Sequence, residues 1–199
     1  MIKTIYEDSY LLVVDKPSGL LTVPTPKKET RTLTGILRLY PCHRLDRDTS
    51  GLIIYAKSKR IQKLMMRKFQ KQEIKKEYTA FISGRLEKAS GQIKSYITDN
   101  PYEPKKLAVT NYKLLRQFKD FAQVLAVPET GRTNQIRIHF KELGHPLLGE
   151  SRFAFRRDFK IKFKRVALHA SRLVFSHPVT NEKLDFYCEL PADLKSLST

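Results

Sequence analysis

Residues 43–57 of this chain read HRLDRDTSGLIIYAK, and this stretch is the most informative part of the sequence. Its first half is polar and charged and stops at Gly51, whereas its second half is almost entirely apolar. This pattern predicts a charged loop that leads into a buried strand. Loops held at the ends of strands often carry catalytic side chains, so this loop is the first candidate for a functional site.

Two carboxylates lie in the loop, Asp46 and Asp48, and two arginines flank them, Arg44 and Arg47. Ion pairs with these arginines would keep the carboxylates ionised. The same residue types also make an ordinary capped turn with salt bridges on a protein surface. The loop residues by themselves leave both interpretations open.

The length of the chain and its cysteines bound the class of protein. It has 199 residues, enough for one compact domain or for two lobes that share one core. Its apolar runs are short, and its first residues lack the apolar stretch of a secretory signal. Its two cysteines, Cys42 and Cys188, lie far apart and outside any metal-ligand spacing. We therefore expect reduced thiols, a cytoplasmic location, no metal site and no membrane span.

The strongest signal in the composition is positive charge. Lysines and arginines number 38 against 20 acidic residues, which gives a net charge of +18. Such an excess makes the folded chain repel itself and indicates a polyanionic partner. Nucleic acid is favoured over a membrane because no stretch combines strong amphipathicity with an apolar face for insertion. The alternative is a basic surface that is only solvated.

The pattern of apolar residues predicts an α+β fold. Two stretches are expected to be helical: 58–71, with Ile61, Met65 and Phe69 in its apolar stripe, and 133–143, which stops before Gly144. Most successive strands have no helix between them, which indicates a largely antiparallel sheet. The strand-like runs are 10–15, 51–56, 78–83, 111–115, 121–127, 173–175 and 184–188.

Two segments are unusually basic. One is the polar face of the predicted helix 58–71, which could be solvated or could contact RNA. The other is 152–165, where phenylalanines are interspersed with lysines and arginines. Residues 159–163 could form a half-buried strand, or the segment could be a basic loop or strand that lies along RNA phosphates. Both can hold if one face packs while the other binds.

The stretch 43–57 resembles the signature of the RluA family of RNA pseudouridine synthases, a His-Arg-Leu-Asp run followed by Thr-Ser-Gly and then an Ala-Lys pair. Other parts of the chain resemble the later and earlier blocks of that family, in family order and over nearly the whole chain. They are 15–20 (DKPSGL), 76–78 (KEY), 129–139 (ETGRTNQIRIH), 145–149 (HPLLG), 168–170 (LHA) and 175–178 (FSHP).

The resemblance implies one pseudouridine synthase catalytic domain over residues 1–199, with a mixed, largely antiparallel sheet, flanking helices and a central RNA-binding cleft. It implies that Asp46 is the catalytic aspartate, that Tyr78 packs against the target base and that Arg137 pairs with the aspartate. Arg44 matches an arginine that helps to displace the base from its stack. The expected RNA contacts are Arg44, Arg132, Arg156, Arg157, Lys160 and Lys162.

The reaction that the resemblance implies needs no cofactor: uracil is detached from its ribose, turned and rejoined through carbon. The target uridine must first be swung out of its stack, at a cost of a few kcal/mol. Stacking on the ring of Tyr78 can return about 1–3 kcal/mol of this. Asp46 could stabilise positive character on the sugar, act as a nucleophile or remove a sugar proton, and all three roles stay open. The Tyr78 hydroxyl could also assist proton removal from carbon.

The chain departs from the family pattern at two places. Asn134 stands where the family commonly has histidine, and Glu150 and a basic run follow Gly149 where the family usually continues with Asp and a Tyr-Gly pair. This second departure concerns substrate contacts near Glu150 and not the catalytic centre. Many relatives carry an S4-type RNA-binding domain, whereas the first catalytic strand is expected almost at once here. Extra RNA affinity is then expected from the basic segments 58–76 and 152–165.

The main alternative is an RNA-binding or ribosome-assembly protein that keeps the fold without catalysis, and a second is an unrelated basic nucleic-acid-binding protein. Taken singly, Arg137 could be a surface arginine and Tyr78 a core residue. Their presence together with Asp46 favours the enzyme. We expect a monomer whose substrate is ribosomal or transfer RNA. Four histidines are expected to be structural: His139, His145, His169 and His177.

Overall fold

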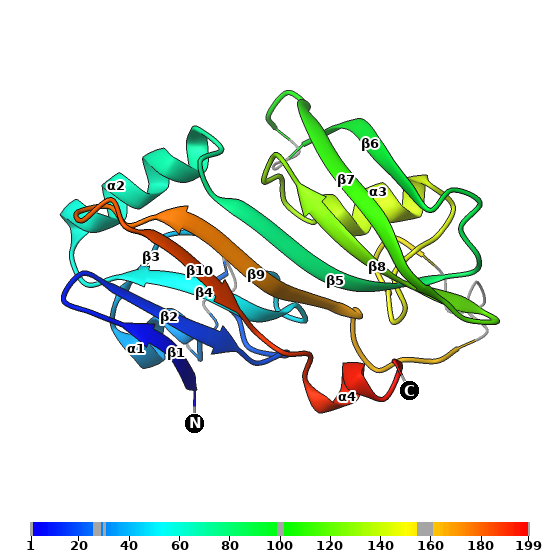
Figure 1. Cartoon of the computed structure of the whole chain (residues 1–199), viewed down its shortest axis with the longest axis horizontal. Coiled ribbons are helices and arrows are strands. Elements are labelled where there is room, and N and C mark those ends of the chain that lie inside the picture. The colour runs from blue at the N-terminus through cyan, green and yellow to red at the C-terminus, as the bar shows by residue number, and fades with distance from the viewer. Residues whose placement is uncertain (1, 26–28, 30, 99–101, 155–160, 199) are drawn as a thin grey trace. The chain divides into compact units, whose positions relative to one another are not determined.

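The computed structural model describes residues 2–25, 29, 31–98, 102–154 and 161–198 (Figure 1). The chain forms two compact units. Unit 1 contains Met1–Lys75 and Ala170–Pro191, and unit 2 contains Lys76–His169 and Ala192–Thr199. Each unit has its own cluster of buried apolar side chains. One catalytic domain over residues 1–199 stays a prediction.

Unit 1 is built on a sheet in the order β1-β2-β4-β9, with β10 beside β9 and β3 beside β4. The pairs β1–β2, β2–β4, β3–β4 and β9–β10 are antiparallel. β4 is buried at every position, which explains the apolar half of the stretch 43–57. The elements are β1 (Lys3–Glu7), β2 (Leu11–Lys16), α1 (Leu33–Leu37), β3 (Tyr40–Pro41), β4 (Ser50–Ala56), α2 (Lys59–Gln70), the later part of β9 (Leu168–Ser176) and β10 (Lys183–Tyr187).

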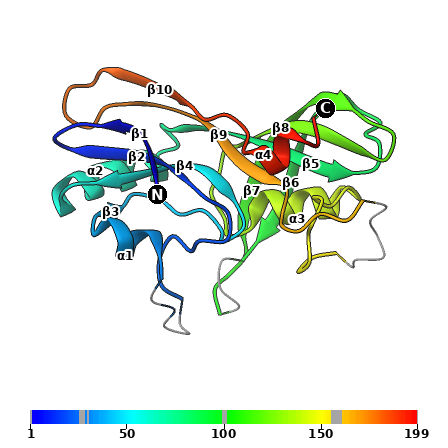
Figure 2. The same cartoon turned by 90° about the horizontal axis from the view of Figure 1, so that it is seen from below.

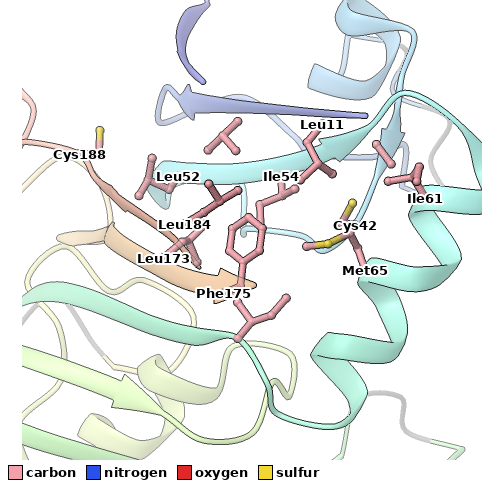
Figure 3. Close-up of a cluster of buried hydrophobic side chains, with 13 residues drawn as sticks. Leu11, Cys42, Leu52, Ile54, Ile61, Met65, Leu173, Phe175, Leu184 and Cys188 are labelled. Atoms are coloured by element: carbon pink, nitrogen blue, oxygen red, sulfur yellow. The ribbon is translucent and has the colours of Figure 1, made fainter. Parts of the chain in front are cut away.

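Helix α2 covers this sheet as its sequence predicts. Ser58 caps the helix, because its hydroxyl accepts a hydrogen bond from the backbone N–H of Ile61 at 3.3 Å. Ile61 and Met65 are buried on the face that points into the cluster of apolar side chains of the sheet, among them Ile54 and Phe175 (Figure 3). The predicted helix over 58–71 is therefore confirmed.

Unit 2 is built on strands in the order β5-β8-β7-β6, all paired antiparallel. Alternate residues of β8 are buried, and α3 lies along that side of the strands, where Ile136 and Phe140 join the buried cluster (Figure 2). The elements are β5 (Lys75–Ser83), β6 (Ser90–Ile97), β7 (Lys106–Gln117), β8 (Phe121–Pro128), α3 (Gln135–Glu142) and α4 (Ala192–Lys195).

The predicted α+β class and largely antiparallel sheet are confirmed, and each predicted strand overlaps an observed one. One interpretation of the basic segment 152–165 was a half-buried strand. Residues 161–165 are not in a strand, although half-buried and exposed residues alternate there. Arg156, Arg157 and Lys160 lie outside the described residues. Within the described ranges, no helix is long and apolar enough to cross a membrane.

Candidate active site

The loop that carries Asp46 lies in unit 1 between β3 and β4. Its neighbours in the chain are fixed on both sides of the aspartate. The buried Leu45 donates its backbone N–H to the Thr22 hydroxyl at 3.2 Å, and that hydroxyl donates to the Leu45 carbonyl at 2.9 Å. On the other side, the Arg47 carbonyl accepts from the backbone N–H of Gly19 at 2.9 Å. Asp46, which is half-buried, therefore sits on a backbone with little freedom.

A fully buried lysine completes this support. The Lys16 ammonium donates to the carbonyls of Leu20 at 2.7 Å, Pro17 at 3.0 Å and Arg47 at 3.0 Å. Three carbonyl acceptors satisfy an ammonium group that would otherwise be costly to bury. The block 15–20 thus works as a brace for the Asp46 loop, a role that its sequence did not reveal.

Gly51 fixes the start of β4 against β9. Its φ of +110° lies in the region that favours glycine, and a Cβ there would lie 2.3 Å from the Ala170 carbonyl oxygen. No other residue fits without moving the backbone of β9. This close approach explains the glycine of the Thr-Ser-Gly run and holds the end of the Asp46 loop in register.

The two arginines of the loop differ in their contacts. Arg47 pairs with Glu29, and this hydrogen bond and charge, with a smaller contribution from Asp48, raise the pKa of the Arg47 guanidinium. Arg44 is exposed and has no ion pair in the described part of the chain. The Arg47–Glu29 pair is a salt bridge on the protein surface, of the kind expected if the loop were an ordinary capped turn. An exposed Arg44 remains compatible with a contact to RNA.

Arg137 is held within unit 2 by a carboxylate that the sequence analysis did not assign. On α3, its Nε donates to Glu150 Oε2 at 2.7 Å and its Nη2 to Glu150 Oε1 at 2.8 Å. Its Nη1 donates to Asn134 Oδ1 at 2.6 Å, and its guanidinium lies 5.2 Å from the ring centroid of Phe153. The side chain of Arg137 is 11% exposed and that of Glu150 is fully buried.

The Glu150 carboxylate stays ionised although it is buried. Burial by itself would raise the pKa of Glu150, but hydrogen bonds from Arg137 and from the backbone of Arg152 and Phe153, with the charge of Arg137, hold this pKa below its ordinary value. The pair is therefore a charged one near neutral pH. Asn134, one of the two departures from the family pattern, supplies the third bond to Arg137.

Tyr78 and Lys76 lie on the same face of β5, since side chains alternate along a strand. Tyr78 is half-buried and packs partly against the core of unit 2. The Lys76 ammonium donates to the Thr130 carbonyl at 3.1 Å, and burial lowers the pKa of Lys76 to about 8. Tyr78 is thus neither a fully buried core residue nor a plain surface one.

The loop 129–134, which carries Arg132, is fixed by a buried amide. The Gln135 carbonyl oxygen accepts from the backbone N–H of Arg132 at 3.0 Å and from the Thr130 hydroxyl at 2.6 Å. The amide nitrogen of Gln135 donates to the carbonyl of Val109 at 2.9 Å and to the Thr110 hydroxyl at 3.0 Å. Gln135 belongs to the block 129–139, but its type alone did not mark it as the residue that holds this loop on β7.

Comparison with known proteins identifies the family. The sequence model of the RNA pseudouridylate synthase family matches residues 10–142. The chain belongs to this family.

Two relatives and a solved structure agree with the family match. The chain is 37% identical over 205 residues to the dual-specificity RNA pseudouridine synthase RluA of Escherichia coli (strain K12), covering 95% of this chain and 92% of that protein. It is 33% identical over 227 residues to the ribosomal large subunit pseudouridine synthase D of Haemophilus influenzae, with 98% and 69% covered. Human RNA Pseudouridylate Synthase Domain Containing 1 superposes with a TM-score of 0.80 at 25% identity, covering 96% of this chain and 84% of that chain.

The resemblance to the RluA family is therefore confirmed, and with it the pseudouridine synthase fold. By family the chain is an enzyme, an RNA pseudouridine synthase, and no finding favours a protein without catalysis. The roles of individual residues go beyond what the family match shows. Asp46 and Arg44 belong to unit 1, whereas Tyr78, Arg132, Arg137 and the exposed Lys162 belong to unit 2. The pairing of Asp46 with Arg137 and a cleft that binds RNA stay predictions.

Three of the four histidines make hydrogen bonds within the fold. His139 Nδ1 lies 2.8 Å from the Thr110 hydroxyl, and His145 Nδ1 lies 2.9 Å from the Ser83 carbonyl. His177 Nδ1 accepts from the backbone N–H of Thr180 at 3.0 Å, and its Nε2 lies 3.0 Å from Asp8 Oδ2. These contacts agree with the structural role expected for the histidines.

Proposed function

We propose that this pseudouridine synthase isomerises specific uridines in ribosomal or transfer RNA, with Asp46 as the essential carboxylate. The observation that carries the assignment is the bracing of the Asp46 loop, in which Leu45 and Arg47 are fixed by hydrogen bonds and the half-buried aspartate lies between them. Catalysis by a positioned group requires this kind of preorganised backbone. A surface turn whose only role is to connect two strands would need no buried lysine beneath it.

The proposed steps use side chains of this chain alone. The target uridine leaves its stack, and the Tyr78 ring stacks on the displaced base. Arg44, exposed beside Asp46 in the sequence, helps to displace the base. The Asp46 carboxylate then acts at the sugar while the glycosidic bond breaks, and the same uracil rejoins through carbon-5. Arg137 supports the ionised form of Asp46, and a proton leaves carbon-5 after the new bond forms.

The substrate is proposed from chemistry and from the names of relatives. One relative is named for the large ribosomal subunit and another for dual specificity, so ribosomal RNA is the first substrate to test and transfer RNA the second. The net charge of +18 suits a long polyanion of either kind. We propose that the protein acts in the cytoplasm as a monomer.

The direct test is the pure protein with unmodified RNA. Incubation with ribosomal or transfer RNA transcripts labelled with tritium at uracil carbon-5 is expected to release tritium, and mapping of the product is expected to show pseudouridine at a small set of positions. The same positions are expected to stay uridine in cells that lack the gene. If none of these RNAs releases tritium under conditions in which a known relative is active, the proposed substrate class is wrong.

The exposed face of α2 is proposed to hold RNA phosphates. Helix α2 has no acidic residue, and only Lys68 among its cations is in an ion pair in the described residues, with Glu73 at 3.6 Å. At a rise of 1.5 Å per residue, the basic stripe is about 18 Å long. One strand of a duplex carries a phosphate every ~3.4 Å of axis, so the stripe can pass several phosphates. The exposed cations of this stripe are Lys59, Arg60, Lys63, Arg67 and Lys71.

Replacing Lys59, Lys63 and Arg67 together by glutamine is expected to weaken RNA binding and to flatten its salt dependence. Each lost phosphate contact removes about 0.7–0.9 from the slope of log affinity against log salt, so the slope should fall by about 2–3 if all three cations contact phosphates. Glutamine keeps helix propensity, so α2 should remain folded. The measurement is RNA affinity at several salt concentrations.

A matched control removes three exposed cations elsewhere: Lys88, Lys113 and Lys119, each replaced by glutamine. Both triple variants lose the same net charge. An equal flattening in both would show that net charge, and not the α2 face, carries the effect. An unchanged slope in the α2 variant would mean that this face is only solvated.

A further inference from the structure

The contacts of Glu150 indicate a role beyond charge balance. It binds Arg137 through both carboxylate oxygens, at 2.7 and 2.8 Å, in the side-on geometry that fixes the plane of a guanidinium. Arginine has a long, flexible side chain, so an unrestrained Arg137 would sample several orientations. The bidentate pair selects one of them.

The Glu150 carboxylate is itself held in place. Its Oε1 accepts from the backbone N–H of Arg152 at 2.8 Å and of Phe153 at 3.3 Å. The preceding Gly149 has a φ of +73°, and a Cβ at that position would lie 1.8 Å from the Arg165 carbonyl oxygen. Glu150 is therefore a fixed anchor and not a side chain that follows Arg137.

The bonds to Glu150 and Asn134 occupy only some of the N–H donors of the Arg137 guanidinium. They use three of the five N–H donors of Arg137, one of them on each nitrogen. The other two donors lie on the terminal nitrogens, one on each. Because the other three are occupied by fixed partners, the direction of these two donors is fixed as well.

We propose that Glu150 is a positioning residue for the reaction: it holds the Arg137 guanidinium in the one orientation in which Arg137 acts. The inference rests on the proposed function, because Arg137 acts in the reaction only if that function holds. Asn134 assists from the opposite side of the guanidinium. A purely structural role for Glu150 would instead be to hold the backbone of residues 152 and 153.

A double-mutant cycle separates the two roles. Glu150→Gln keeps the shape but removes the charge and one acceptor, and we expect the single-turnover rate at saturating RNA to fall by about 100-fold. Arg137→Lys, which cannot form the bidentate pair, should also lower the rate. In the Arg137→Lys background, Glu150→Gln should lower the rate by less than about threefold, because the group that it positions is already gone. RNA affinity should stay within about threefold throughout.

The matched control breaks another bidentate pair, between Arg172 and Asp185, whose contacts are 2.8 and 2.6 Å. Asp185→Asn is expected to leave the single-turnover rate within about twofold. If Glu150→Gln lowers the rate as much in the Arg137→Lys background as in wild type, Glu150 acts through the backbone and the proposal is wrong. If Glu150→Gln does not fold, Asn134→Gly carries the same cycle, since glycine tolerates the φ of +56° found at Asn134.

A second readout needs no activity. In the NMR spectrum of the wild-type protein, the Arg137 Nε–H signal, assigned with Arg137→Lys, is expected to exchange slowly with water, and Glu150→Gln should abolish this protection. Loss of protection with a retained fold supports the anchor even if no RNA substrate is found, in which case only the proposed function fails. Unchanged protection in Glu150→Gln would overturn the inference directly.

Discussion

Replacement of Asp46 by asparagine is expected to abolish pseudouridine formation and to leave RNA binding within about twofold. The two side chains are nearly isosteric, and the backbone of the loop is held by Thr22, Gly19 and Lys16, none of which contacts the Asp46 side chain in the bonds described above. The variant should therefore fold and bind. Loss of the anionic carboxylate should lower the single-turnover rate by at least ~10³-fold, the scale for removal of an essential catalytic group. Tritium release from carbon-5-labelled RNA measures the rate.

The neighbouring carboxylate provides the control for this variant. Asp48 is also half-buried and lies two residues further along the same loop, where its carbonyl accepts from the Ser18 hydroxyl at 2.8 Å. Asp48→Asn removes the same charge from the same loop and is expected to keep the rate within about tenfold. Appreciable turnover by pure Asp46→Asn, or an equal loss in Asp48→Asn, would contradict the assignment of Asp46.

The elements predicted from the sequence are those whose burial pattern is strong. Helix α2 has a complete apolar stripe and a serine cap, and β4 is buried along its whole length and is apolar from Leu52 onward. β1 and β6 were not predicted: β1 has no buried residue, and β6 contains Gly91 and buries only Ile93 and Ile97. Edge strands bury little, so their sequences carry little of the periodic signal that marks a strand.

From the sequence, only those site residues could be predicted that match the family pattern one by one. Asp46, Tyr78 and Arg137 were named from their blocks, but what holds them comes from segments far away in the chain. Glu150 lies 13 residues beyond Arg137, and the Lys16 bond to Arg47 spans 31 residues. Sequence patterns report the local environment of a residue, whereas these contacts depend on how the loops pack.

The replacement of Tyr78 by phenylalanine and by alanine is expected to separate the two roles of its side chain. If stacking on the displaced base is the whole role, Tyr78→Phe should keep the single-turnover rate within about tenfold, because it keeps the ring. Tyr78→Ala loses a stacking contact of about 1–3 kcal/mol, which corresponds to a fall of roughly 5- to 150-fold. Both rates are measured at saturating RNA by tritium release.

Stability must be measured alongside, because Tyr78 also packs partly against the core of unit 2. Tyr112 offers the matched comparison: it belongs to the same core, is 7% exposed and packs edge-on against Phe140 with ring centroids 5.8 Å apart. Tyr112→Phe tests what loss of a core hydroxyl does to folding, and it should leave the rate unchanged. If Tyr78→Phe is as inactive as Tyr78→Ala while it unfolds at the same denaturant concentration as wild type, stacking alone does not explain Tyr78. The hydroxyl would then be required, as expected of a group that takes part in removing the proton from carbon-5.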